Sequence, residues 1–270
     1  MIVGELKEKA KLIRKKILDM ALSAGSGHIA SAFSCVEILI SLYHGGVLRV
    51  KPNNPTYNKR DRFILSKGHA AIALYAILAD CGFFPDSVLV RFAKETGHLG
   101  VHPEMTTPGI DVLSGSLGHG LSVGSGLALA AKLNREKYIT VVLLGDGECQ
   151  EGMIWEAARF SSQRRLNNLV AIVDYNKLSA TDFLKEGLSA GILRKKWKAF
   201  GWESMVVDGH SFDKLLPILN KIHKRVAYKP LAIIAATTKG KGVSFMENNP
   251  IWHYRIPVGN ELKFAFREMK

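Results

Sequence analysis

An acidic turn follows a run of apolar residues near the middle of the chain. The sequence VVLLGDGECQEG at 141–152 holds Asp146 between two glycines, and two glutamates follow closely. Asn176 comes about 30 residues later, after a second apolar run, which is a normal length for one strand-helix-strand unit. Carboxylate and amide oxygens are hard ligands that suit Mg²⁺ or Ca²⁺. The pair therefore predicts a cation site where two neighbouring strands end.

The cation would need further oxygen ligands beyond these two side chains. Magnesium is rarely caged by protein alone and keeps coordination positions for phosphate oxygens, so one acid and one amide predict a diphosphate ligand. Gly145 and Gly147 fit this hypothesis, because glycine permits a tight turn and close approach of a ligand to the backbone. Asp-Gly and Asn-Lys are also common turn formers, and each residue alone would favour that explanation. Their spacing favours the cation site.

Histidines form the second group that could do chemistry, because imidazole can donate, accept and titrate near neutral pH. Four of the nine lie in loop segments marked by glycine or proline and are candidate site residues: His28, His69, His102 and His253. Another four are interpreted as side chains satisfied at the surface or in the core: His44, His98, His210 and His223.

The elements that must position these residues show a regular alternation. Four runs are rich in β-branched residues, and a weaker fifth precedes them: 139–144, 169–174, 203–207, 231–235 and 62–65. Helical patterns separate them, which predicts an α/β fold with a mostly parallel sheet flanked by helices on both faces. Ligands bind beyond the carboxyl ends of strands in such sheets, where Asp146 and Asn176 fall. No linker or repeat divides residues 1–270, so we expect a single domain.

Helices are predicted from apolar spacing and end signals. Residues 4–23 carry apolar positions at helical spacing and precede Gly25, a plausible stop. Ser34 stands three residues before Glu37, which is the capping-box spacing and predicts the start of a second helix. Residues 70–81 predict a third helix, and a helix from Gly152 to Arg165 would form the crossover between the strands that end at Asp146 and Asn176.

Composition bounds the class of protein. Hydrophobic residues make up 47% of the 270 residues and charged residues 23%, which is ordinary globular usage. No apolar run reaches the roughly 18 residues of a membrane span, and the N-terminus lacks the order of a signal peptide. We therefore expect a cytosolic protein with no membrane contact. Cys35, Cys81 and Cys149 lie far apart and predict neither a disulfide framework nor a zinc site.

The formal charge of +13 favours anionic partners, and nucleic acid has to be considered. The basic residues are scattered, and pairs such as Lys15 with Lys16 fall on helical segments, where solvated faces are the commoner explanation. This pattern argues against nucleic acid, and phosphorylated small molecules fit the charge equally well. A basic nucleic-acid binder stays an alternative, which predicts salt-sensitive retention on DNA or RNA.

The acidic turn and Asn176 together resemble the thiamine diphosphate motif, and their surroundings resemble the transketolase family in its split form, where two chains share the work. The matching segments run in family order over nearly the whole chain: SGH at 26–28, SKGHA at 66–70, VHPE at 101–104, TPGIDVLSGSLGHGLSVGSGLALA at 107–130, GDGECQEGMIWEAA at 145–158, DGH at 208–210 and KGKGVSFMENNPIWH at 239–253. The resemblance implies the thiamine diphosphate-binding fold of the N-terminal, diphosphate-binding domain.

The resemblance also implies roles for residues of the acidic turn. Asp146, Asn176 and the carbonyl of Leu178 would ligate the metal, which would be Mg²⁺ or else Ca²⁺ or Mn²⁺. Gly147 would contact the diphosphate through its backbone, and His69 would also face the cofactor.

The same resemblance predicts a partner. Gly115 and Leu117 would line the aminopyrimidine and thiazolium side of the cofactor, and Glu151 would lie at the subunit interface in a carboxylate relay toward a second active site. The family's glutamate that activates the aminopyrimidine belongs to a second domain. We therefore expect an α2β2 assembly with an obligate C-terminal, pyrimidine-binding partner subunit.

The chemistry implied is transfer of a two-carbon ketol unit from a ketose phosphate to an aldose phosphate, with the cofactor acting covalently. His28 and His69 would donate to the developing alkoxide. His102 would hold the hydroxyl of the two-carbon unit, and His253 would take part in proton transfer.

Three departures from the family pattern put the substrate in question. Ile29-Ala30 replaces Pro-Gly, His119 stands where glutamine is more typical, and Tyr254 stands where glycine is expected. Two alternatives keep the cofactor: an α-type subunit of a 2-oxo acid decarboxylating enzyme, and a specialised two-carbon transferase. A dinucleotide-binding dehydrogenase is weaker, because G-x-G-x-x-G is absent from the strand-to-helix turns.

Overall fold

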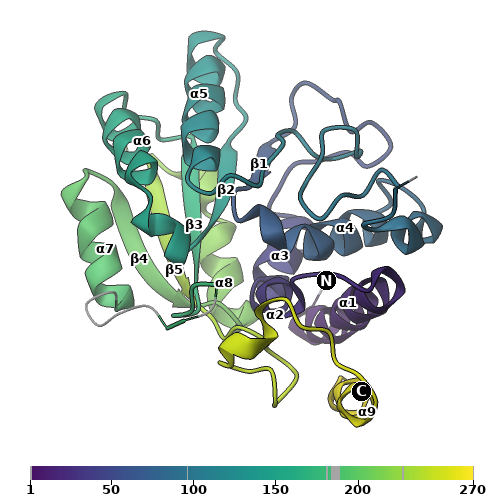
Figure 1. Ribbon diagram of the computed structural model, residues 1–270. Helices are drawn as coiled ribbons and strands as arrows, with labels where there is room; N and C mark the ends of the chain where they lie inside the picture. The colour runs from purple at the N-terminus through teal and green to yellow at the C-terminus, as the bar shows by residue number, and fades with distance from the viewer. Residues whose placement is uncertain (1, 96, 181, 184–188, 227, 270) are drawn as a thin grey trace.

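A five-stranded, wholly parallel sheet forms the centre of the molecule, in the order β1-β2-β3-β5-β4 (Figure 1). The computed structural model describes residues 2–95, 97–180, 182–183, 189–226 and 228–269. The strands are β1 (Arg62–Leu65), β2 (Thr140–Gly145), β3 (Leu169–Tyr175), β4 (Glu203–Asp208) and β5 (Leu231–Ala236). All five predicted strands are confirmed, with small shifts of their ends.

Burial explains why these runs are apolar without interruption. Every residue of the central strand β3 is buried, and β2 is buried up to Gly145, because helices cover both faces of the sheet. The edge strand β4 instead mixes exposed and buried positions. The sequence of each strand thus reflects its place in the sheet.

Helices cover the two faces in two groups. The longer elements are α1 (Val3–Ala24), α2 (Ile29–Ser34), α3 (Val36–Tyr43), α4 (Ala71–Asp80), α5 (His119–Leu133), α6 (Gly152–Gln163), α7 (Ala190–Ala199), α8 (Phe212–Leu219) and α9 (Asn260–Glu268). Helices α5, α6 and α7 pack on one face, and α1, α3, α4 and α8 pack on the other, each group with its own apolar core (Figure 1). No helix of the described residues is long and apolar enough to cross a membrane.

All four predicted helices are confirmed, with the second present as α3, but the predicted capping box at its start is wrong. Ser34 is the last residue of α2, and α3 begins after Cys35 without a side-chain cap. The Ser34 hydroxyl donates to the carboxylate of Asp174, 140 residues away, at 2.5 Å. A tertiary hydrogen bond therefore takes the side chain that the local rule assigned to a helix start.

The sheet brings the acidic turn and Asn176 together. Strands β2 and β3 are neighbours, with Gly145 paired to Asp174. Asp146 and Asn176 follow these two strands at the same edge of the sheet, and the Asp146 N–H donates to the Asp174 carbonyl at 3.2 Å. The expected juxtaposition at the carboxyl edge is therefore present.

Candidate functional site

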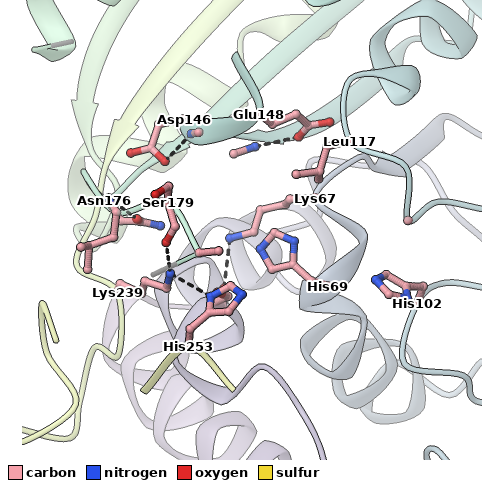
Figure 2. Close-up of a pocket in the computed structure, with 16 residues that line it drawn as sticks. Lys67, His69, His102, Leu117, Asp146, Glu148, Asn176, Ser179, Lys239 and His253 are labelled. Atoms are coloured by element: carbon pink, nitrogen blue, oxygen red, sulfur yellow. Dashed lines mark hydrogen bonds between the residues drawn. The ribbon is translucent and has the colours of Figure 1, made fainter. Parts of the chain in front are cut away.

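A cavity of about 320 Å³ opens at the carboxyl edge of the sheet, a size typical of small-molecule sites (Figure 2). The candidate residues that line it are His69, His102, Gly115, Leu117, Asp146, Gly147, Asn176, Leu178 and His253. His28 and Glu151 are the two candidates that do not belong to the lining. His28 contacts the lining histidines, whereas Glu151 is exposed at the start of α6.

Asp146 is a buried acid fixed by its own turn. One carboxylate oxygen accepts the Gly147 N–H at 2.8 Å, and the other accepts the Lys177 N–H at 2.6 Å. Burial, and then the charge of Asp174, raise the pKa of Asp146 to about 6. The amide oxygen of Asn176 accepts the Leu178 N–H at 3.1 Å. A cation beside these oxygens would relieve the cost of the buried negative charge.

The oxygen ligands of this turn do not form a complete metal site. No group of three or more His, Cys, Asp or Glu side chains suited to a metal occurs within the part of the chain that the structure describes. The donor set is one carboxylate, one amide and nearby backbone carbonyls, which suits a hard cation that takes its remaining ligands from a phosphate. The residues therefore fit a magnesium diphosphate and do not fit a free-standing metal centre.

The four candidate histidines gather around His28 although they come from distant segments. Its ring centroid lies 5.0 Å from that of His253, 5.5 Å from His69 and 6.4 Å from His102. The pKa of His28 and that of His253 are lowered to about 4, mainly by burial. Burial also holds the pKa of His69 well below its usual range. These three rings are neutral at physiological pH, so each has one donor and one acceptor nitrogen.

Two buried lysines line the same cavity, although no sequence pattern singled them out. Lys67 pairs with Asp174 and also donates to the Ser31 carbonyl at 3.1 Å. Lys239 donates to the Ser179 carbonyl at 2.7 Å and contacts the Nδ1 atom of His253 at 3.0 Å (Figure 2). Asp174 offsets the charge of Lys67, and Lys239 leaves a cation beside the acidic turn that suits phosphate.

Burial and the charge of Lys67 lower the pKa of Lys239 to about 8. Both hydrogen-bond partners of Lys239 among the described residues are neutral, in contrast to the ion pair of Lys67. The signal that could have identified both lysines is their position in the segments SKGHA and KGKG, at the ends of β1 and β5.

The two glutamates of the acidic turn differ in their surroundings. Glu148 is buried and accepts the N–H groups of Gly118 and Gly145 at 2.9 Å each, together with the Ser66 hydroxyl. It therefore joins the acidic turn to the end of β1 and to the loop before α5. Glu151 is exposed, and its side chain lies against Gly118. Its interface role concerns a second chain and stays a prediction.

Three histidines interpreted as satisfied are held by neighbours outside the cavity. The Nε2 atom of His44 lies 2.7 Å from the Asp80 carboxylate, and that of His223 lies 3.1 Å from the Val47 carbonyl. His210 contacts the Glu37 carboxylate at 2.8 Å. These contacts confirm the interpretation for the three, and His98 is exposed.

Comparison with known proteins identifies the class to which this fold and site belong. The profile described as "Transketolase, thiamine diphosphate binding domain" matches residues 6–261. The chain is 40% identical over 269 residues to one of the subunits of apulose-4-phosphate transketolase from Phocaeicola vulgatus, covering 100% of this chain and 95% of that protein. It is also 40% identical over 267 residues to a 6-deoxy-6-sulfo-D-fructose transketolase subunit of Clostridium sp., covering 98% and 96%.

Among solved structures, transketolase from Campylobacter jejuni superposes with a TM-score of 0.92 at 29% identity. The match covers 100% of this chain and 43% of that one, so the chain spans less than half of that relative. The chain belongs to the transketolase family, as its thiamine diphosphate-binding domain. The predicted α/β fold and the resemblance to this family are both confirmed.

Proposed function

We propose that this chain is the cofactor-binding subunit of a split transketolase. With a C-terminal partner subunit, it would transfer a two-carbon ketol unit from a ketose phosphate to an aldose phosphate. The observation that carries this proposal is the meeting of two ligand sets at one cavity. The oxygens of Asp146 and Asn176 suit a cation, and the rings of His69, His102 and His253 suit a polyhydroxylated substrate.

The residues present fit thiamine diphosphate with a divalent cation. Asp146, Asn176 and the Leu178 carbonyl would hold Mg²⁺, or Ca²⁺ or Mn²⁺ in its place. Lys239 is a buried cation without an acidic partner among the described residues, so it would complement the diphosphate beside Gly147. Gly115 and Leu117 would line the ring side of the cofactor, as the position of both in the cavity wall permits.

Bound thiamine diphosphate would supply the covalent chemistry that cleaves and forms the carbon-carbon bond. The chain's own histidines would act on the oxygens of the substrate. His28 and His69 are neutral donors that would stabilise the oxygen on which negative charge develops. His102 would orient the hydroxyl of the two-carbon unit.

His253 has a defined tautomer under this proposal. Because the ammonium of Lys239 donates to its Nδ1 atom, a neutral His253 carries its proton on Nε2. That Nε2–H group would then donate its proton to an oxygen of the bound substrate. The pKa of Lys239, lowered to about 8, still leaves most of its ammonium protonated at neutral pH.

A partner subunit is supported by the surface beside the cavity. Leu117 lines the cavity and is 37% exposed, and Leu113 and Val123 nearby are 64% and 40% exposed. Large apolar side chains that gather beside a site favour a protein interface. Two relatives carry names of subunits, which supports a partner chain, and we propose an α2β2 assembly. Glu151, exposed at this surface, would face the partner.

A specialised ketose phosphate is the proposed donor. The relatives are named for apulose 4-phosphate and for a sulfonated deoxyfructose. Tyr254, which departs from the family pattern, contacts His28 at the site. Apulose 4-phosphate is the first substrate to try, followed by common ketose phosphates.

The deciding experiment combines the chain with its candidate partner. Co-expression with a neighbouring reading frame that encodes a pyrimidine-binding half should give a complex that transfers two-carbon units when thiamine diphosphate and Mg²⁺ are added. Asp146→Ala is the negative control and should lose cofactor binding in calorimetry. A complex that binds the cofactor yet cleaves none of the ketose phosphates, or Asp146→Ala with undiminished binding, would refute the proposal.

A further inference from the structure

Tyr254 lies against His28 at the rim of the site. It follows the short 3-10 helix Pro250–His253, and its ring meets the His28 ring edge-on, with centroids 4.7 Å apart. Its hydroxyl lies 2.6 Å from the Ser26 hydroxyl, two residues before His28 in the chain. The tyrosine is 51% exposed and lies outside the lining of the cavity. It therefore contacts His28 and the loop that carries His28 at the same time.

His28 differs from the other histidines of the site in how its ring is held. Lys239 fixes the Nδ1 atom of His253. The Nδ1 atom of His28 is buried and has no hydrogen-bond partner among the residues that the structure describes. The preceding loop contains Gly25 and Gly27, with φ angles of 65° and 147°. The Gly25 and Ser26 N–H groups tie this loop to carbonyls at the end of α1, but these backbone bonds do not reach the imidazole itself.

Contacts with neighbouring rings must therefore fix the His28 imidazole, and Tyr254 supplies the nearest of them. The next residue along has anchors of its own: Arg255 packs on the Trp252 ring at 4.4 Å and pairs with Glu261 at 2.6 Å. The end of this segment therefore does not depend on the tyrosine for its place. The contacts of the Tyr254 side chain with Ser26 and His28 therefore serve the loop that carries His28 and not the segment after Tyr254.

We propose that Tyr254, anchored through Ser26, is a positioning residue that holds the His28 imidazole in the active site. The inference rests on the proposed function, because His28 acts there as a donor to the substrate oxygen. Tyr254 touches neither cofactor nor substrate in this role. It fixes the ring edge-on and, through the Ser26 hydroxyl, restrains the loop between Gly25 and His28.

The kinetic test uses the complex with its partner subunit. Tyr254→Ala should lower kcat about tenfold, because a displaced donor forfeits part of the hundredfold or greater loss expected when a donor is removed. KM for the ketose phosphate should change little, and Tyr254→Phe, which keeps the ring but loses the bond to Ser26, should give a kcat between those of the wild type and Tyr254→Ala. Adding Tyr254→Ala to His28→Asn should cause no further loss, because the tyrosine acts through the histidine. Tyr57→Ala, outside the cavity, is the control.

A second measurement does not depend on turnover. In the full chain labelled with ¹³C-histidine, Tyr254→Phe, which keeps the neighbouring ring but removes its anchor on Ser26, should shift the ring resonance of His28 more than that of His69, whereas Tyr57→Ala should shift neither. A wild-type complex without two-carbon transfer would refute the proposed function, and the resonances would still decide the positioning role. Losses in kcat that multiply in the double variant, or a His28 resonance that stays in place, would overturn that role.

Discussion

Replacing Asp146 by Asn should stabilise the metal-free chain near neutral pH. Burial raises the pKa of this carboxyl from 3.8 to about 6, a shift of about two units. At about 1.4 kcal/mol per unit, ionisation of the buried acid costs about 3 kcal/mol of unfolding free energy above pH 7. The amide has one acceptor oxygen, so either Gly147 or Lys177 loses an N–H partner, which costs about 1–2 kcal/mol. The net gain is about 1–2 kcal/mol.

The gain should depend on pH in a defined direction. The folded-state pKa of Asp146 lies above its unfolded value, so the wild-type chain has its full stability from this group below about pH 4. The wild-type chain loses that stability as the pH rises from about 4 to about 6, and the loss stays constant at higher pH. Asn does not titrate. Urea unfolding in a chelator should therefore show an advantage of the variant at pH 7.5 that is absent or reversed at pH 4.

Ligands should invert the comparison. Magnesium and thiamine diphosphate together at a hundred times their dissociation constant should stabilise the wild-type chain by about 2.7 kcal/mol and leave Asp146→Asn unchanged. Asp213→Asn, at an exposed position in α8, is the matched control and should respond like the wild type. The role of Asp146 as a buried metal ligand would be refuted if Asp146→Asn were equally destabilised at both pH values. It would also be refuted if the ligands stabilised Asp146→Asn as much as the wild type.

Three further changes test other parts of the site. Lys67→Met leaves Asp174 charged and without its cation in the interior, so urea unfolding should show a free energy of unfolding lower by about 3–5 kcal/mol. A decrease below about 1 kcal/mol would contradict the ion pair. Glu151→Gln should leave the stability of the isolated chain within about 0.5 kcal/mol of wild type but slow two-carbon transfer by the assembled complex; unchanged turnover would remove its interface role. Burial raises the pKa of the Cys35 thiol to about 12, so mass spectrometry should detect its alkylation at pH 8 only after unfolding.

The sheet could be predicted because its sequence signal is local. Strands β2 and β3 are buried on both faces, so their runs are almost wholly apolar, and a polar residue follows each strand end at the same edge of the sheet. The positions of Asp146 and Asn176 follow from this rule alone. The order of the strands does not, because the insertion of β5 between β3 and β4 depends on packing between distant segments.

The helix boundary near Ser34 shows why local rules fail beside the site. The capping-box spacing from Ser34 to Glu37 is present in the sequence, yet Ser34 bonds to Asp174 and Glu37 pairs with Arg14 at 2.7 Å. Both side chains of the motif are engaged by residues far away in the chain. The buried carboxylate on β3 competes for the hydroxyl more strongly than the N–H groups at the start of α3, because an unsatisfied buried charge is costly.

The protonation states of the site are the part that sequence patterns cannot supply. A histidine in a glycine-marked loop is recognisable, but whether it is neutral depends on burial and on the charges around it. Lys67 and Lys239 come from segments that meet only in the folded chain, and their charges, together with burial, keep His28 and His253 unprotonated. The pair of Lys67 with Asp174 joins residues 107 positions apart. Neutral donors beside buried lysines thus arise from tertiary contacts, and the motifs mark only where those contacts converge.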